Sequence, residues 1–175
     1  GIGYRVAPYD DENHREGVST LDLVLIQKHL LGKAKLNSPY KIIAADANNS
    51  GHLTALDLLE IRKLILGIID RYSSNTSWRF VDRNYGFIDP YNPFTPPFPE
   101  SVWIDSVSGG IDTANFVGIK VGDVNGSYFL HRSAGEKLQP RSNAMYGLKL
   151  SEKADQESGK VQRMIKALPG QSKID

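Results

Sequence analysis

An internal repeat is the strongest constraint on what this chain can fold into. When the 175-residue sequence is slid against itself, residues 11–32 recur thirty-five positions later as residues 46–67. A repeat of this length is one supersecondary unit used twice, and neighbouring copies bury each other's apolar faces. In each copy the second half carries apolar residues three or four positions apart and then reaches a glycine, Gly32 or Gly67. The sequence therefore predicts two short helices packed antiparallel against one another.

Each predicted helix is apolar over more than one stripe. The apolar positions are Leu21, Leu23, Val24, Leu25, Ile26, Leu30 and Leu31 in the first copy, and Leu56, Leu58, Leu59, Ile61, Leu64, Ile65 and Ile68 in the second. A helix with so wide an apolar surface buries two faces, and we expect one of them to lie against its twin. A shorter helix is expected to begin at Ser38-Pro39, where a capping residue precedes proline, and to end at Ala45.

The residues ahead of the second helix have the spacing of an EF-hand-type calcium loop. Counted from Asp46, oxygen-bearing side chains stand at loop positions 1, 3, 5, 9 and 12, with glycine at position 6 and an apolar residue at position 8. These side chains belong to Asp46, Asn48, Ser50, Thr54 and Asp57. At position 7, His52 supplies its backbone carbonyl and not its ring. Ca²⁺ takes six to eight oxygen ligands, so the pattern predicts a calcium site.

Two features of this loop set its expected properties. Gly51 supplies the sharp turn at position 6, and Asp57, in the first helical turn, closes the ligand cage. With two carboxylates instead of four, we expect a dissociation constant of about 10⁻⁴ to 10⁻³ M, a range typical of extracellular modules and not of cytosolic sensors. The alternative interpretation is a metal-free turn followed by a helix that Thr54 caps.

The first copy of the loop is degenerate. Alignment through the helices assigns four residues to ligand positions 1, 3, 9 and 12: Asp11, Asn13, Ser19 and Asp22. However, Arg15 falls at position 5, where a cation repels Ca²⁺ unless its side chain swings outward. The sequence therefore favours a solvated, capped loop. The alternative is a calcium site with altered geometry, rescued by Asp10, Glu12 or Glu16.

A third candidate loop begins in the same way at Asp123. Asp123, Asn125 and Ser127 stand at positions 1, 3 and 5, but position 12 falls on Ala134, which has no side-chain oxygen. A calcium cage cannot close there in the standard manner. We therefore expect a turn centred on Asn125-Gly126, with a metal site as the alternative.

Between the repeat and this third loop, aromatic residues alternate with prolines, from Tyr72 to Trp103. The prolines exclude a helix and disfavour a regular sheet over residues 89–100. We expect the rings to pack an irregular wrap onto the helices, because aromatic side chains dominate small cores. The alternative is an aromatic platform for sugar rings. Residues 78–81 and 116–121 alternate well enough to be short strands.

The chain divides into three parts by amino-acid composition and sequence pattern. Residues 1–70 hold the duplicated loop–helix unit, and residues 71–130 an aromatic, proline-rich extension packed on it with short strands. Residues 131–175 are a linker or the start of a following β-domain, in which residues 144–150 and 160–167 are expected to be strands. The expected fold class is mainly α with a small β part: paired EF-hand-like loop–helix repeats wrapped by an irregular segment.

Composition excludes several classes of function. The 21 Lys and Arg nearly balance the 20 Asp and Glu, so a net charge of +1 gives no field toward nucleic acid or acidic membranes. No apolar run reaches the roughly 18 residues of a membrane span, so we expect no membrane insertion. The absence of cysteine removes thiolate catalysis and disulfides, for which a bound metal is the common substitute. Since the four histidines show no metal-ligand spacing and no nucleophile motif appears, we do not expect an enzyme.

Four separated blocks of the sequence match, in order, one recurring module. They are residues 17–29, 38–46, 75–81 and 116–125, and both loop–helix units carry Asp at position 12 and end in Leu-Gly. In these features the chain resembles type I dockerin domains, and more closely a dockerin-like module of large secreted and cell-surface proteins of Bacteroidota. The resemblance spans about residues 4–127. It implies an extracellular location within a longer multi-domain chain, and often export by the type IX secretion route.

The resemblance also implies a partner. Dockerins bind cohesin domains through surface residues of their two helices, where Lys28 and Lys63 are the candidate interaction residues. The expected partner is a neighbouring domain of the same chain or another surface protein, with a cohesin-like domain among the candidates. The alternative function is carbohydrate adhesion through the aromatic residues of 72–103, with Trp78 and Trp103 as the contact residues.

Overall fold

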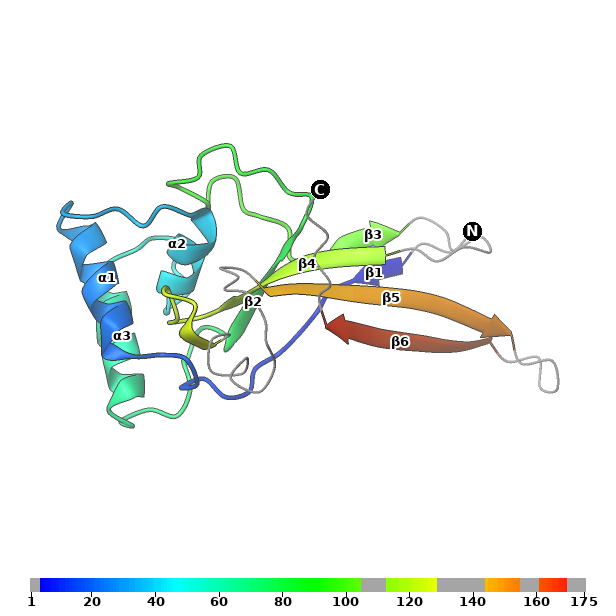
Figure 1. Ribbon diagram of the computed structural model, residues 1–175, viewed down its shortest axis with the longest axis horizontal. Coiled ribbons are helices and arrows are strands. Elements are labelled where there is room, and N and C mark those ends of the chain that lie inside the picture. The colour runs from blue at the N-terminus through cyan, green and yellow to red at the C-terminus, as the bar shows by residue number, and fades with distance from the viewer. Residues whose placement is uncertain (1–3, 105–112, 129–143, 155–160, 170–175) are drawn as a thin grey trace.

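Three helices form one end of the molecule and antiparallel strands extend from it (Figure 1). The structure is a computed structural model that describes residues 4–104, 113–128, 144–154 and 161–169. The helices are α1 (Thr20–Leu30), α2 (Pro39–Ala45) and α3 (Ala55–Ile65). Within the described ranges, no helix is long and apolar enough to cross a membrane.

The predicted repeat is visible in α1 and α3. Each helix has 11 residues, with Ser19 and Thr54 as the N-cap residues. Each is followed by a glycine with positive φ, 67° at Gly32 and 69° at Gly67, as a helix-ending glycine requires. The two helices lie side by side in Figure 1. A Cβ built on Gly67 would lie 2.9 Å from an Arg15 guanidinium nitrogen, so the segment that leads into α1 lies beside the end of α3. The predicted antiparallel packing is therefore present.

The short helix α2 forms where a capping residue meets proline. Ser38 is its N-cap residue, and Pro39 stands at the first helical position, where the missing N–H has no partner to lose. Four consecutive residues at its end, Ile42 to Ala45, are buried. Its C-cap residue is Asp46, so α2 leads directly into the second loop.

Two antiparallel sheets account for the strands. In the smaller one β1 (Tyr4–Val6) pairs with β3 (Val102–Ile104). The larger sheet contains β2 (Trp78–Asp82), β4 (Thr113–Lys120), β5 (Ala144–Ala154) and β6 (Val161–Pro169), in the order β2-β4-β5-β6. All four strands predicted from the sequence are present, and residues 89–100 form neither helix nor strand. Since β5 pairs with β4, the strands beyond residue 131 extend this sheet; the domain division at that residue stays a prediction.

The strand β4 contributes to two clusters of buried side chains. Val117 and Ile119 belong to the main core, with Ile26, Ile43 and Ile61 from the three helices. Phe116 belongs to a second cluster, because successive side chains of a strand point to opposite faces. The main core is covered by the expected wrap of partly or fully buried rings, from Tyr85, Phe87, Phe94 and Phe98. Residues 117–124 therefore contribute Val117, Ile119, Val121 and Val124 to the same core as the helices.

Candidate metal centre

The predicted carboxylate ligands of the second loop are fixed by helix ends. Asp46 caps the end of α2, and Asp57 is the third residue of α3. Both side chains are buried, with 1% and 0% of their surface exposed. The loop between them turns tightly through positive φ at Asn49 (56°) and Gly51 (73°). The glycine thus adopts the left-handed conformation that position 6 was predicted to need.

Backbone amides of this loop point at its carboxylates. Asp46 accepts hydrogen bonds from Ser50 N at Oδ1 and from Gly51 N at Oδ2, both at 2.9 Å. Asp57 accepts hydrogen bonds from Asn48 N at 3.2 Å and from Thr54 N at 2.8 Å. The backbone of the loop is therefore folded around its two carboxylates.

The neutral oxygens join the same network. Ser50 N also bonds Asn48 Oδ1 at 3.0 Å, and the Ser50 hydroxyl donates to the His52 carbonyl oxygen at 3.0 Å. The Thr54 hydroxyl donates to Asp57 Oδ2 at 3.2 Å. The structure therefore brings together all six residues predicted to hold Ca²⁺ in this loop.

The donor set fits a hard cation. Every group is an oxygen, from two carboxylates, one amide, two hydroxyls and one backbone carbonyl, which is the chemistry that Ca²⁺ prefers. Burial raises the pKa of Asp46, and the nearby Asp57 carboxylate raises it further. A bound cation offsets the cost of placing two carboxylates side by side away from water. Among the described residues no three His, Cys, Asp or Glu side chains gather at one point, so such a site depends on its neutral oxygens.

The contiguous first loop has a different arrangement. The Asp11 carboxylate accepts a hydrogen bond from Ser77 N at 2.9 Å and lies 2.9 Å from His14 Nε2. Because Ser77 directly precedes β2, the Asp11 side chain lies at the start of that strand. Arg15 reaches the end of α3 at Gly67, and Asn13 is exposed with φ of 54°. The side chains predicted at positions 1 and 5 are therefore directed to other parts of the molecule.

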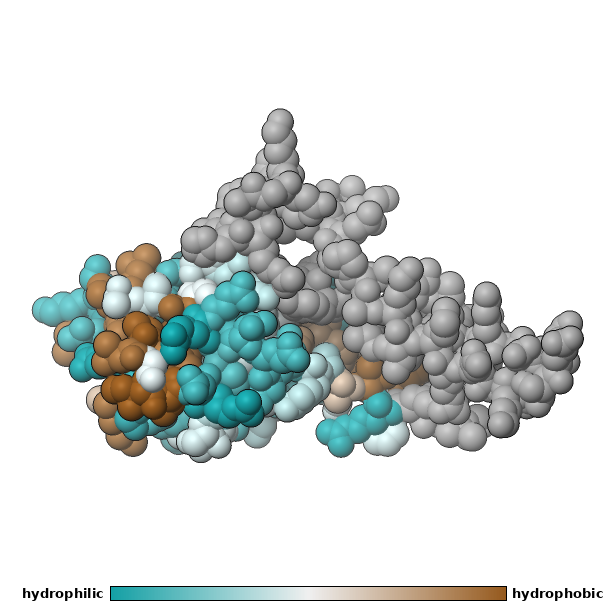
Figure 2. All heavy atoms as spheres, turned by 90° about the horizontal axis from the view of Figure 1, so that it is seen from below, coloured by the Kyte–Doolittle hydropathy of each residue, from teal (hydrophilic) through white to brown (hydrophobic). Residues whose placement is uncertain are grey.

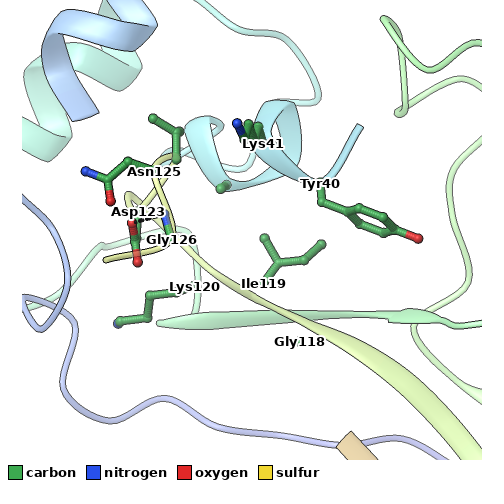
Figure 3. A pocket seen from close by; sticks show the side chains of 10 residues that line it. Tyr40, Lys41, Gly118, Ile119, Lys120, Asp123, Asn125 and Gly126 are labelled. Carbon is green, nitrogen blue, oxygen red and sulfur yellow. Dashed lines mark hydrogen bonds between the residues drawn. The ribbon is translucent and has the colours of Figure 1, made fainter. Parts of the chain in front are cut away.

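The turn that follows β4 hydrogen-bonds to the start of the first repeat helix, in the place where the first half of a calcium loop was expected. Asp22, which is fully buried, accepts at Oδ1 the N–H groups of Val124 (2.9 Å) and Asn125 (3.1 Å). The Ser127 hydroxyl donates to the Gly17 carbonyl oxygen at 2.7 Å. Figure 3 shows Asp123, Asn125 and Gly126 together on this turn, past Lys120 at the end of β4. The first and third loops, which are far apart in the sequence, therefore lie together in the structure.

The candidate interaction residues differ in exposure. Lys28 is exposed, whereas Lys63 is half-buried and pairs with Glu60 Oε1 at 2.8 Å. Trp78 is 3% exposed, and its ring meets the Tyr128 ring edge-on at 4.9 Å between centroids. Trp103, on β3, is 66% exposed. The carbohydrate alternative therefore depends on Trp103 and not on Trp78.

Each of the two longer helices carries an exposed apolar stripe. Equivalent residues of the repeat have similar exposed fractions: 54% and 61% for Leu21 and Leu56, 44% for Val24 and for Leu59, and 64% and 66% for Leu31 and Leu66. We call these six residues the apolar stripes. Figure 2 shows apolar side chains gathered at the helical end of the molecule. Exposed apolar surface of this kind is typical of interaction sites.

Comparison with known proteins agrees with the loop–helix geometry. Residues 9–66 match the family model of the dockerin type I domain, a range that includes the first loop, the second loop and all three helices. No curated protein and no solved structure matches the chain.

Proposed function

We propose that this dockerin-like chain is a calcium-dependent docking module, without catalytic activity, of a secreted or cell-surface protein. Its residues 9–66 match the dockerin type I family, whose members bind partner proteins in a calcium-dependent way. Asp46, Asn48, Ser50, His52, Thr54 and Asp57 hold Ca²⁺, and the apolar stripes on α1 and α3 contact the partner. The partner is a cohesin-like domain of another surface protein or of the same chain.

The observation that carries this proposal is the matched exposure of the apolar stripes. A monomeric surface gives no reason for six large aliphatic side chains to be at least 44% exposed at equivalent positions of two helices and their C-caps. Covering each half-exposed side chain contributes on the order of 1 kcal/mol, before the cost of ordering the interface is subtracted. Lys28 and Lys63 stand at equivalent positions within these stripes and supply charge for orientation.

Calcium in loop 46–57 would bind at the start of α3, the helix that carries one of the two apolar stripes. The loop joins α2 to α3, and Asp57 belongs both to the ligand set and to the capping box of α3. Neutralising the buried carboxylates holds the first turn of α3, and with it Leu56 and Leu59, in place. Docking is therefore expected to weaken when calcium is removed.

An extracellular location is supported by the chemistry of the loop. A site with two carboxylates and an affinity of about 10⁻⁴ to 10⁻³ M fills only where calcium is millimolar, as it is outside cells. The chain has no cysteine, so calcium takes the stabilising role that disulfides have in other small secreted modules. The resemblance of residues 4–127 to a Bacteroidota surface module supports export by the type IX route.

The test measures binding of purified cohesin domains to the full chain by calorimetry, in millimolar calcium and in excess chelator. Leu21→Glu and Leu56→Glu each place a charge in an apolar stripe and are expected to weaken binding at least about tenfold. Ile88→Glu is the matched control, because Ile88 is an aliphatic residue 80% exposed outside the helices. Binding that is equally strong in chelator, or that neither stripe variant weakens, contradicts the proposal.

A further inference from the structure

The turn at residues 123–128 reproduces the hydrogen bonds of the first half of loop 46–57. In both, the residue four positions after the first aspartate donates its N–H to Oδ1 of that aspartate, at 2.9 Å in the loop and 3.0 Å in the turn. The same N–H reaches the amide oxygen of the intervening asparagine, at 3.0 and 2.7 Å. The next residue donates to Oδ2, at 2.9 and 2.8 Å. The matched residues are Asp46 and Asp123, Asn48 and Asn125, Ser50 and Ser127.

The start of the first repeat reproduces the second half of loop 46–57. The asparagine N–H is accepted by Oδ1 of Asp57 at 3.2 Å in the loop, and by Oδ1 of Asp22 at 3.1 Å here. The serine hydroxyl donates to the His52 carbonyl at 3.0 Å in the loop, and to the Gly17 carbonyl at 2.7 Å here. In both, the N-cap residue donates its N–H to Oδ2 of the helix aspartate at 2.8 Å. Two distant segments therefore assemble one complete copy of the loop.

The residues that made the first loop degenerate stand aside from this assembly. Arg15, at position 5 of the contiguous alignment, reaches Gly67, and Asp11, at position 1, bonds Ser77 N. The turn thus provides Asp, Asn and Ser at the three positions that the first repeat fills with Asp11, Asn13 and Arg15. The first repeat still provides positions 7, 9 and 12, which are Gly17, Ser19 and Asp22.

A buried hydroxyl at this place points to a ligand. Tyr72 is 3% exposed, and its hydroxyl has no hydrogen-bond partner in the protein. It lies against Gly122, where a Cβ would collide with it, next to Asp123 in the chain. Burial raises the pKa of Tyr72, and the Asp22 carboxylate is close enough to raise it further. A buried polar group needs a partner, and a cation held between Asp22 and Asp123, or water on that cation, provides one.

The charges at this place also favour a cation. Asp22 and Asp123 are 0% and 6% exposed, and burial raises the pKa of both carboxyls. The Asp123 carboxylate raises the pKa of Asp22 further, so the two repel one another. The neighbouring ammonium of Lys120 lowers the pKa of Asp123, but it donates its hydrogen bonds to the carbonyl oxygens of His14 (3.2 Å) and Ser77 (3.4 Å). A divalent cation between the two carboxylates removes their repulsion.

We propose that the first repeat has a second calcium site, split between two segments of the chain. Asp123, Asn125 and Ser127 provide ligand positions 1, 3 and 5, and the Gly17 carbonyl, Ser19 and Asp22 provide positions 7, 9 and 12. The proposal rests on the proposed function, because loop 46–57 serves as its template. In this arrangement calcium ties the end of β4 to the start of α1, so the extension after the dockerin match completes the module.

The test counts calcium ions by titration calorimetry on the full chain after chelator removes bound metal. The unmodified chain is expected to bind two Ca²⁺, and Asp123→Asn and Asp46→Asn are each expected to bind one. Asp11→Asn is the matched control: it changes the first ligand position of the contiguous alignment and is expected to keep both ions. Far-UV circular dichroism checks the fold of each variant. If Asp123→Asn unfolds, Asn125→Ala and Ser127→Ala, at half-buried positions, are expected to weaken one of the two sites at least about tenfold.

The outcomes separate this inference from the proposed function. One ion bound, lost in Asp46→Asn and kept in Asp123→Asn, leaves the second loop as the calcium site and overturns the split site. The split site is also overturned if the chain binds two ions, Asp11→Asn loses one of them, and Asp123→Asn and the Asn125 and Ser127 variants lose none. That result would favour the contiguous first loop. No calcium bound at millimolar concentration overturns both proposals.

Discussion

Gly122 is the position where a single methyl group best tests the contact between the turn and the helices. Its φ is +90°, so Gly122→Ala places a side chain in the left-handed region at a cost of about 1–2 kcal/mol. The new Cβ would also lie 3.0 and 3.1 Å from the two Val18 methyl groups and collide with the Tyr72 hydroxyl. Overpacking of this kind costs about 1–3 kcal/mol. We therefore expect Gly122→Ala to lower the free energy of unfolding by about 2–5 kcal/mol.

Gly32→Ala is the matched control for Gly122→Ala. Gly32 has φ of +67°, but a Cβ there would meet no atom within 4 Å, so only the backbone cost of about 1–2 kcal/mol applies. Urea unfolding of both variants in saturating calcium measures the difference, expected to be about 1–3 kcal/mol. Adding Tyr72→Phe to Gly122→Ala removes the colliding hydroxyl and is expected to recover part of the loss. The reasoning is refuted if Gly122→Ala costs no more than Gly32→Ala.

Three further predictions concern residues that are not among the proposed calcium ligands. Burial lowers the pKa of Lys120 to about 8, so from pH 8 to pH 9.5 the unfolded state holds more protons. Stability is therefore expected to rise by about 1–2 kcal/mol over this range, and not to rise in Lys120→Met, as measured by urea unfolding. Trp78→Ala is expected to lower the free energy of unfolding by about 3–5 kcal/mol, whereas Trp103→Ala is expected to change it by less than about 0.5 kcal/mol. If Trp103→Ala abolishes glycan binding and leaves the melting temperature unchanged, the carbohydrate alternative is supported. Arg79→Gln breaks a two-point contact with Glu100, at 2.6 and 3.1 Å, and a hydrogen bond to Asn49 Oδ1. It is expected to lower the free energy of unfolding by about 1 kcal/mol, against a few tenths for Lys63→Gln; an equal cost in thermal melts would contradict this.

The local structure of this chain is predictable from sequence because each element carries its own signal. The repeat and its glycines predict α1 and α3, and Ser38-Pro39 predicts the start of α2. Alternating residues predict the strands, and the prolines of residues 89–100 predict their absence there. Loop 46–57 is contiguous, so the spacing of its oxygens also predicts which side chains lie together.

The relation between the first and third loops is a tertiary property and has no contiguous signal. The first loop has suitable residues at positions 7, 9 and 12 but Arg15 at position 5, and the third has suitable residues at positions 1, 3 and 5 but Ala134 at position 12. The two incomplete halves are complementary, which is the signal that a search for split loops would use. That they meet depends on β4 pairing with β2 and packing against α2. The unpaired Tyr72 hydroxyl has no sequence signal at all.

The most direct test of a calcium-stabilised module is the free energy of unfolding of the full chain across a calcium series, with excess chelator as the reference. Above the dissociation constants each bound ion adds about 1.4 kcal/mol per tenfold increase in calcium, so the slope counts ions. We predict about 2.8 kcal/mol per decade for the unmodified chain, half of that for Asp46→Asn or Asp123→Asn, and no slope when both changes are combined. A stability that does not change between chelator and millimolar calcium would contradict the account.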